Sequence, residues 1–139
     1  TTPFQGELTL LKVTENIPFD VDNMTMNPII VPKKNDTIVT VVDSRQVSTK
    51  WKLYVNYVNP MIEKSGKVLL DSLFFKKFDN DSIDLKTEKK LIFEASDNGG
   101  NVSVSNVTFS PDKGLYLKPS SSLLEDEDYS TLIIWSVEE

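Results

Sequence analysis

Hydrophobic and polar residues alternate over several short stretches of this chain, and a two-residue period is typical of half-buried β-strands. The clearest case is residues 50–58, where Trp51, Leu53, Val55 and Tyr57 share one face. Residues 37–43 are rich in β-branched side chains, which favour strands. Further strands are predicted at residues 8–13, 29–31, 73–78, 91–93, 102–109, 115–117 and 129–137.

The segments between these strands carry turn and loop signals. Residues 97–100 (Asp-Asn-Gly-Gly) and 111–114 (Pro-Asp-Lys-Gly) predict turns. The polar residues 79–90 predict a surface loop that is anchored by Ile83 and Leu85. In the less regular residues 59–71, the sequence fits a helical turn at 60–62 and a strand at 67–70. About nine short strands separated by turns predict an all-β fold, an antiparallel β-sandwich or flattened barrel.

Two of the predicted strands have features of their own. In residues 102–109, Val102 and Val104 lie on one face and Val107 and Phe109 on the other, so we expect a β-bulge near Ser105. Residues 129–137 predict one continuous strand. The side chains expected on its inner face are Tyr129, Thr131, Ile133, Trp135 and Val137.

Composition narrows the classes of function. The 139 residues predict a single domain over residues 1–139, and the net charge of −6 argues against general nucleic-acid binding. The absence of Cys and His excludes Ser-His-Asp triads, Cys nucleophiles and the usual zinc sites. The chain contains no run of 18 apolar residues, so the sequence predicts no membrane span. The scattered lysine pairs, such as Lys33-Lys34, are expected on solvated faces. A start at Thr1 without Met suggests a processed protein or an excised domain.

Both tryptophans of the chain occupy the same sequence setting. Each lies in a predicted strand and is followed two positions later by an aliphatic residue, in Trp51-Lys52-Leu53 and Trp135-Ser136-Val137. Residues two apart in a strand share a face, so each Trp pairs with its aliphatic neighbour. We therefore expect the two strands to be neighbours in one sheet or to face each other across the core.

These motifs resemble the WxL domain of Gram-positive cell-surface proteins, which is named for two Trp-x-Leu motifs. The resemblance includes the opening Gly6-Glu7-Leu8-Thr9-Leu10, the segment Ile17-Pro18-Phe19 and the Asp43-Ser44-Arg45 that precedes the first Trp motif. It covers nearly the whole chain, and the motifs occur in the order typical of the family. The second motif departs from the pattern, because it ends in Val137 instead of Leu.

The resemblance implies a non-catalytic domain that attaches a secreted surface protein non-covalently to the Gram-positive cell wall, by binding peptidoglycan. It places the domain outside the cell, at the cell wall and cell surface. An alternative is a protein–protein adhesion module that binds other cell-surface proteins and uses its Trp motifs only for structure. The candidate binding residues are Trp51, Leu53, Asp43, Arg45, Trp135 and Val137.

The chemistry of these residues leaves two interpretations open for each group. The tryptophans can fill the core, or an indole can stack on the C–H face of a sugar ring. Asp43 and Arg45 are two residues apart and can meet as a charge pair. They form either a surface ion pair worth about 0–1 kcal/mol or a site in which Arg45 binds a stem-peptide carboxylate.

Metal and cofactor chemistry finds little support in the sequence. Residues 79–84 resemble the start of an EF-hand loop, but Ile83, Asp84 and Lys90 occupy positions where that loop needs other residues. Many Asp and Glu residues are present, yet no two are singled out as the carboxylate pair of a glycosidase. We therefore expect no metal, no cofactor and no enzymatic activity.

Overall fold

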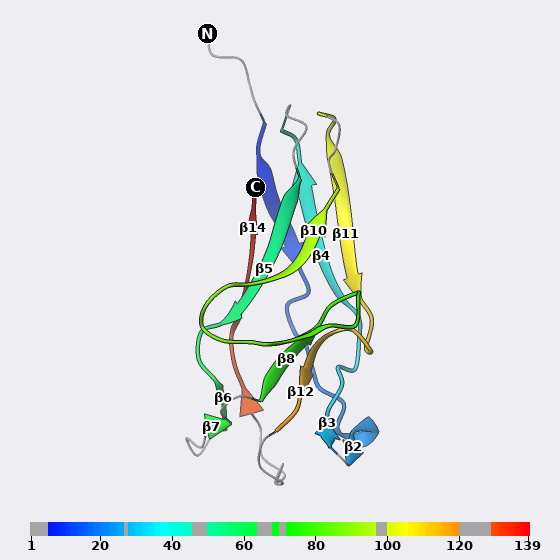
Figure 1. Cartoon of the computed structure of the whole chain (residues 1–139), viewed down its shortest axis with the longest axis vertical. Helices are drawn as coiled ribbons and strands as arrows, with labels where there is room; N and C mark the ends of the chain where they lie inside the picture. Colours follow the sequence, from blue (N-terminus) through cyan, green and yellow to red (C-terminus); the bar gives the residue numbers. More distant parts are fainter. Residues whose placement is uncertain are drawn as a thin grey trace.

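The computed structural model describes residues 6–26, 28–45, 50–63, 68–69, 72–96, 100–119 and 129–139. Two three-stranded antiparallel sheets form the body of the domain and run side by side along its long axis (Figure 1). The β4 sheet has the order β1 (Leu8–Val13), β4 (Thr37–Asp43), β11 (Ser103–Phe109). The β5 sheet has the order β10 (Lys90–Ala95), β5 (Trp51–Tyr57), β14 (Ile133–Glu138). Strands β1 and β14 are in contact, which brings the two sheets together along one side.

Shorter strands form three smaller sheets, which lie toward the lower end of the view in Figure 1. The β8 sheet has the order β12 (Gly114–Leu117), β8 (Leu73–Lys76), β9 (Ser82–Asp84). Another sheet contains β13 (Tyr129–Ser130), β6 (Met61–Glu63) and β7 (Val68–Leu69). Strands β2 (Thr25–Met26) and β3 (Ile29–Ile30) form a two-stranded ribbon after the 3₁₀ turn η1 (Val21–Asn23).

One continuous hydrophobic core lies within these sheets. Alternate residues of β4 and β5 point into it, as the two-residue period predicts. Its buried members include Val39, Val41, Trp51, Leu53, Val55, Phe75, Val107, Phe109, Leu115 and Leu117. Because one face of β4 and one face of β5 are buried in this way, the register of these two strands is strongly specified.

The all-β, antiparallel sandwich-like fold predicted from the sequence is confirmed. The described residues contain more strand segments than the nine expected, because several of the additional ones are only two or three residues long. Strands β4 and β5 match their predictions closely, with bounds at Thr37–Asp43 and Trp51–Tyr57. Among the described residues, no helix is long and apolar enough to cross a membrane.

Four local predictions were wrong, three of them within residues 59–109 and one at the last predicted strand. The expected surface loop at 79–90 contains β9, although Leu85 is fully buried, as expected of an anchor residue. In residues 59–71 the strand expected at 67–70 is present as β7, but residues 61–63 form strand β6 and not a helical turn. Strand β11 pairs with β4 in continuous register without a bulge, because Val102 and Val104 point outward and are 71% and 61% exposed.

The last predicted strand is divided at residues 131–132 into β13, which pairs with β6, and β14, which pairs with β5. Register shifts do occur in two other strands. They lie at residues 10–12 of β1 and at residues 91–93 of β10. The turn predicted at 111–114 is present, whereas most of the turn predicted at 97–100 lies outside the described residues.

Candidate functional site

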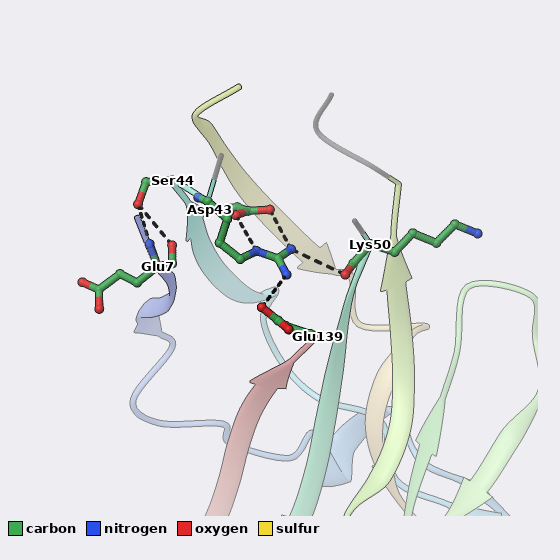
Figure 2. A network of polar contacts seen from close by, with 6 residues as sticks. Glu7, Asp43, Ser44, Lys50 and Glu139 are labelled. Atoms are coloured by element: carbon green, nitrogen blue, oxygen red, sulfur yellow. Dashed lines mark hydrogen bonds and ion pairs between the residues drawn. The ribbon is translucent and has the colours of Figure 1, made fainter. Parts of the chain in front are cut away.

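Asp43 and Arg45 meet at the end of β4, as their spacing predicts (Figure 2). The guanidinium of Arg45 donates from Nε to Asp43 Oδ1 at 2.9 Å and from Nη2 to Asp43 Oδ2 at 3.0 Å. The backbone N–H of Arg45 also donates to Asp43 Oδ1, at 3.1 Å. Two parallel bonds of this kind fix the plane of the guanidinium as well as its position.

The same guanidinium reaches from the β4 sheet to the β5 sheet. Arg45 Nη1 lies 3.3 Å from a carboxylate oxygen of Glu139, just beyond the end of β14. Arg45 Nη2 makes a long contact of 3.5 Å with the carbonyl oxygen of Lys50, just before β5. Arg45 therefore connects the ends of three strands that come from both main sheets (Figure 2).

The Asp43–Arg45 pair is buried, so the interpretation as a surface ion pair was wrong. Asp43 is fully buried and Arg45 is only 5% exposed. The hydrogen bond from Arg45 lowers the pKa of the Asp43 carboxyl below its usual value, against the opposing effect of burial. The hydrogen bond to Asp43 raises the pKa of Arg45. A stem-peptide carboxylate could reach this guanidinium only by displacing one of these partners.

The opening Gly6 packs directly against the same turn. Its φ is +74°, a conformation that favours glycine, and a Cβ built on it would lie 1.8 Å from the carbonyl oxygen of Ser44. The neighbouring backbone is joined by bonds from Ser44 N to Glu7 O and from Glu7 N to Ser44 Oγ, both 3.0 Å. The opening motif and the Asp43-Ser44-Arg45 motif, far apart in sequence, thus form one structural unit.

The two Trp motifs lie on neighbouring strands, as predicted. Strand β14 pairs antiparallel with β5 so that Val137 lies opposite Leu53 and Trp135 opposite Val55. Trp51 and Leu53 are buried, with 2% and 0% exposed, whereas Trp135 and Val137 are half-buried against the core. Trp51 thus fills the core, and stacking of its indole on a sugar would require it to leave the core.

The two indoles are joined by a continuous series of ring contacts. Trp51 contacts Phe93 at 5.7 Å between ring centroids, and Phe93 contacts Phe78 at 5.8 Å. Phe78 stacks on Phe109 at 4.7 Å, Phe109 meets Phe75 at 4.9 Å, and Phe75 meets Trp135 at 6.1 Å. The register places the two tryptophans four positions apart along the β5–β14 pair, roughly 13 Å at about 3.3 Å per residue. These aromatic residues therefore connect the two motifs without direct contact between the indoles.

The structure also contains a buried cation that the sequence analysis missed. Lys33 is 1% exposed, and its ammonium donates to the carbonyl oxygens of Phe109, Ser110 and Lys113. Burial lowers the pKa of Lys33 to about 8, and the charges of Asp36 and Asp112 oppose that shift. The one signal in the sequence is that Lys33 lies two positions after Val31, which is also buried.

The segment that resembles an EF-hand, residues 79–84, forms part of the turn between β8 and β9 and then β9 itself. Lys77 lies 3.8 Å from a carboxylate oxygen of Asp79 and 3.9 Å from one of Asp81, so an ammonium lies beside these acidic groups. Asn80 has a φ of +72°, which Asn tolerates better than most residues. Within the described part of the chain, no group of three or more Asp, Glu, His or Cys side chains could hold a metal ion.

The structure thus brings Asp43, Arg45, Trp51, Leu53 and Val137 to one end of the sandwich, and Trp135 lies farther along the same strand pair. No protein-family model matches this chain, and no curated protein or solved structure matches it significantly.

Proposed function

We propose that this domain attaches a secreted surface protein non-covalently to the Gram-positive cell wall by binding peptidoglycan. The observation that supports the proposal is the convergence of the motifs that carry the WxL resemblance. Gly6 packs on Ser44, Asp43 binds Arg45, and Arg45 reaches the ends of the strands that hold the two Trp motifs. Because these motifs contact one another in the folded chain, we treat them as parts of one functional unit.

In this proposal the motifs act by holding the domain in shape. Asp43, Arg45, Trp51 and Leu53 are at most 5% exposed, so they offer a ligand almost no surface. Contacts with the wall then come from neighbouring exposed side chains, whose positions depend on these four buried residues. Association of a single site costs several kcal/mol, so we expect modest affinity that is increased by avidity on the repetitive wall.

The test is co-sedimentation of the folded domain with purified peptidoglycan from which teichoic acid has been removed. The wild-type domain should pellet with the polymer and stay in solution without it. High salt should reduce binding only in part, because salt screens ionic contacts and leaves apolar stacking in place. If the folded domain stays in the supernatant at every salt concentration, the wall-binding proposal is wrong.

The second candidate is a protein–protein adhesion module, and one surface favours it. The outer face of the β4 sheet exposes Ile38, Val102 and Val104, with exposed fractions of 42%, 71% and 61%. Between them lie uncharged polar residues, including Thr40 and Asn106, which are joined by a hydrogen bond of 2.7 Å. An apolar face of this kind suits a protein partner. A negative result in the co-sedimentation test would favour this candidate.

A further inference from the structure

Phe78, just after β8, is the one exposed ring among the phenylalanines and tryptophans of the described residues. It is 44% exposed, whereas Trp51 is 2% exposed and Trp135 is half-buried. Aromatic side chains dominate the energetics of many interfaces, and an exposed ring offers a flat apolar surface that a ligand can cover. Phe78 therefore provides the exposed aromatic surface that Trp51 cannot.

Two other rings hold the ring of Phe78. It stacks on Phe109 with 4.7 Å between centroids and 7° between planes, and it meets Phe93 at 82°. With both contacts in place, 44% of the surface of Phe78 remains exposed to a ligand. Because two partners fix its orientation, the ring needs little ordering when a ligand binds.

The charged groups around Phe78 balance one another. Two turns meet beside it, residues 77–81 and 110–113, and Lys113 Nζ contacts Asn80 Oδ1 across them. Lys77 lies between Asp79 and Asp81, and Ser110 donates to Asp112. The charged residues of the two turns and the adjoining end of β8 are Lys76, Lys77, Lys113, Asp79, Asp81 and Asp112. On a chain of net charge −6, this surface carries no excess of either sign.

We propose that Phe78 is the ligand-contact residue of the domain and stacks on the C–H face of a pyranose ring in a glycan strand. This inference rests on the proposed wall-binding function and names its ligand as the sugar, not the stem peptide. A charge-balanced surface gives little electrostatic attraction to the carboxylates of a stem peptide, whereas a neutral sugar needs none. The Asp79 carboxylate and the Asn80 amide can form hydrogen bonds with hydroxyl and acetamide groups beside the ring.

The proposal also gives the buried Trp51 a role in binding. Trp51 contacts Phe93, and Phe93 in turn contacts the exposed Phe78. Trp51 is therefore a positioning residue, which acts on Phe78 through one intervening ring, that of Phe93. Its indole remains in the core throughout.

The experiment measures dissociation constants for soluble glycan strands whose stem peptides have been removed by an amidase. Phe78→Leu keeps apolar contact with Phe109 and Phe93 but removes the flat face, and Phe78→Tyr keeps the ring. Leu91→Ala is the matched control, because Leu91 is 40% exposed on the outer face of the β5 sheet. We expect Phe78→Leu to weaken binding by about fivefold or more, and the other two variants to stay within about twofold of wild type. Equal affinity of Phe78→Leu and wild type would overturn the proposal.

Two further measurements keep the outcomes distinct. Backbone NMR shifts of the wild-type protein on addition of the same glycan strands should change mainly in residues 77–81 and 110–113, which tests the site even if Phe78→Leu fails to fold. Shift changes elsewhere would contradict the assignment. If wild type binds intact peptidoglycan but not the peptide-free strands, the sugar is not the ligand and the wall-binding function stands. If it binds neither, both proposals fail.

Discussion

Two buried cations bracket β4, and the protein stabilises them in different ways. Arg45, just after the strand, is bound by the carboxylate of Asp43 and lies close to that of Glu139. Lys33, which precedes the strand, donates instead to three backbone carbonyl groups. A full opposite charge holds the first cation, whereas dipoles hold the second.

The difference is visible in the pKa values. Hydrogen bonding to Asp43 raises the pKa of Arg45, whereas burial lowers the pKa of Lys33 to about 8. Carbonyl dipoles and the more distant Asp36 and Asp112 offset only part of the burial cost of Lys33. The chain therefore stabilises its two buried cations by two different kinds of contact. One end of β4 depends on a partner side chain, and the other on the conformation of the β11–β12 turn.

The largest effect should come from removing the counter-charge. Asp43→Ala leaves the Arg45 guanidinium buried with its main partner gone, and we expect the free energy of unfolding to fall by about 3–5 kcal/mol. Urea denaturation followed by circular dichroism measures this. Glu139→Gln is the control, because Glu139 is 75% exposed and its loss should cost about 1 kcal/mol or less. Similar losses in both variants would mean that Asp43 is not the dominant partner.

A smaller effect is expected at the other end of β4. Lys33→Met keeps an unbranched apolar stem but leaves the carbonyls of Phe109, Ser110 and Lys113 without their donor. We expect a loss of about 2–3 kcal/mol, because unsatisfied neutral acceptors cost less than an unpaired charge. The same denaturation experiment compares the loss of unfolding free energy at the two ends of β4. A cost greater than that of Asp43→Ala would reverse the comparison.

The smallest effects should appear as pH dependence, in a separate pH range for each site, with stability rising with pH in both. The folded pKa of Asp43 is below its usual value of 3.8, so the pair contributes fully above about pH 4 and is lost as pH falls further. The folded pKa of Lys33 is about 8 and its usual value is 10.5, so the unfolded chain binds more protons between these values. Stability of wild type relative to Lys33→Met should therefore rise from about pH 8 to pH 10.5. A flat difference over that range would show that the carbonyl groups fully compensate for burial.

Sequence patterns predicted the parts of the fold where alternation is strict. In β4 and β5, every second residue is buried, and both strands were found with nearly the right bounds. The bulge expected near Ser105 is absent, because Val102 and Val104 are exposed apolar residues, which periodicity cannot distinguish from core residues. Strand β9 was missed because three residues are too short to show a period.

The sequence predicted two contacts among the candidate residues, Asp43 with Arg45 and the pairing of the two Trp strands, but not their environment. The spacing of Asp43 and Arg45 correctly indicated their contact, but not the contacts of Arg45 with Glu139 and with the Lys50 carbonyl, which lie next to other strands. Lys33 was assigned to a solvated face because most lysines are exposed. Its burial depends on the carbonyls of a turn some 76 to 80 residues later in the chain, and short-range patterns contain no record of such a partner.

The unequal burial of the two indoles gives the domain two optical reporters of different character. Trp51 is 2% exposed, so its fluorescence should be shifted to shorter wavelengths and shielded from a dissolved quencher such as acrylamide. Trp135 is half-buried and should be quenched more readily. Because Trp51 contacts Phe93, which contacts Phe78, a ligand on the exposed ring should alter mainly the shielded emission. The protein can thus report on its own binding surface without an added label.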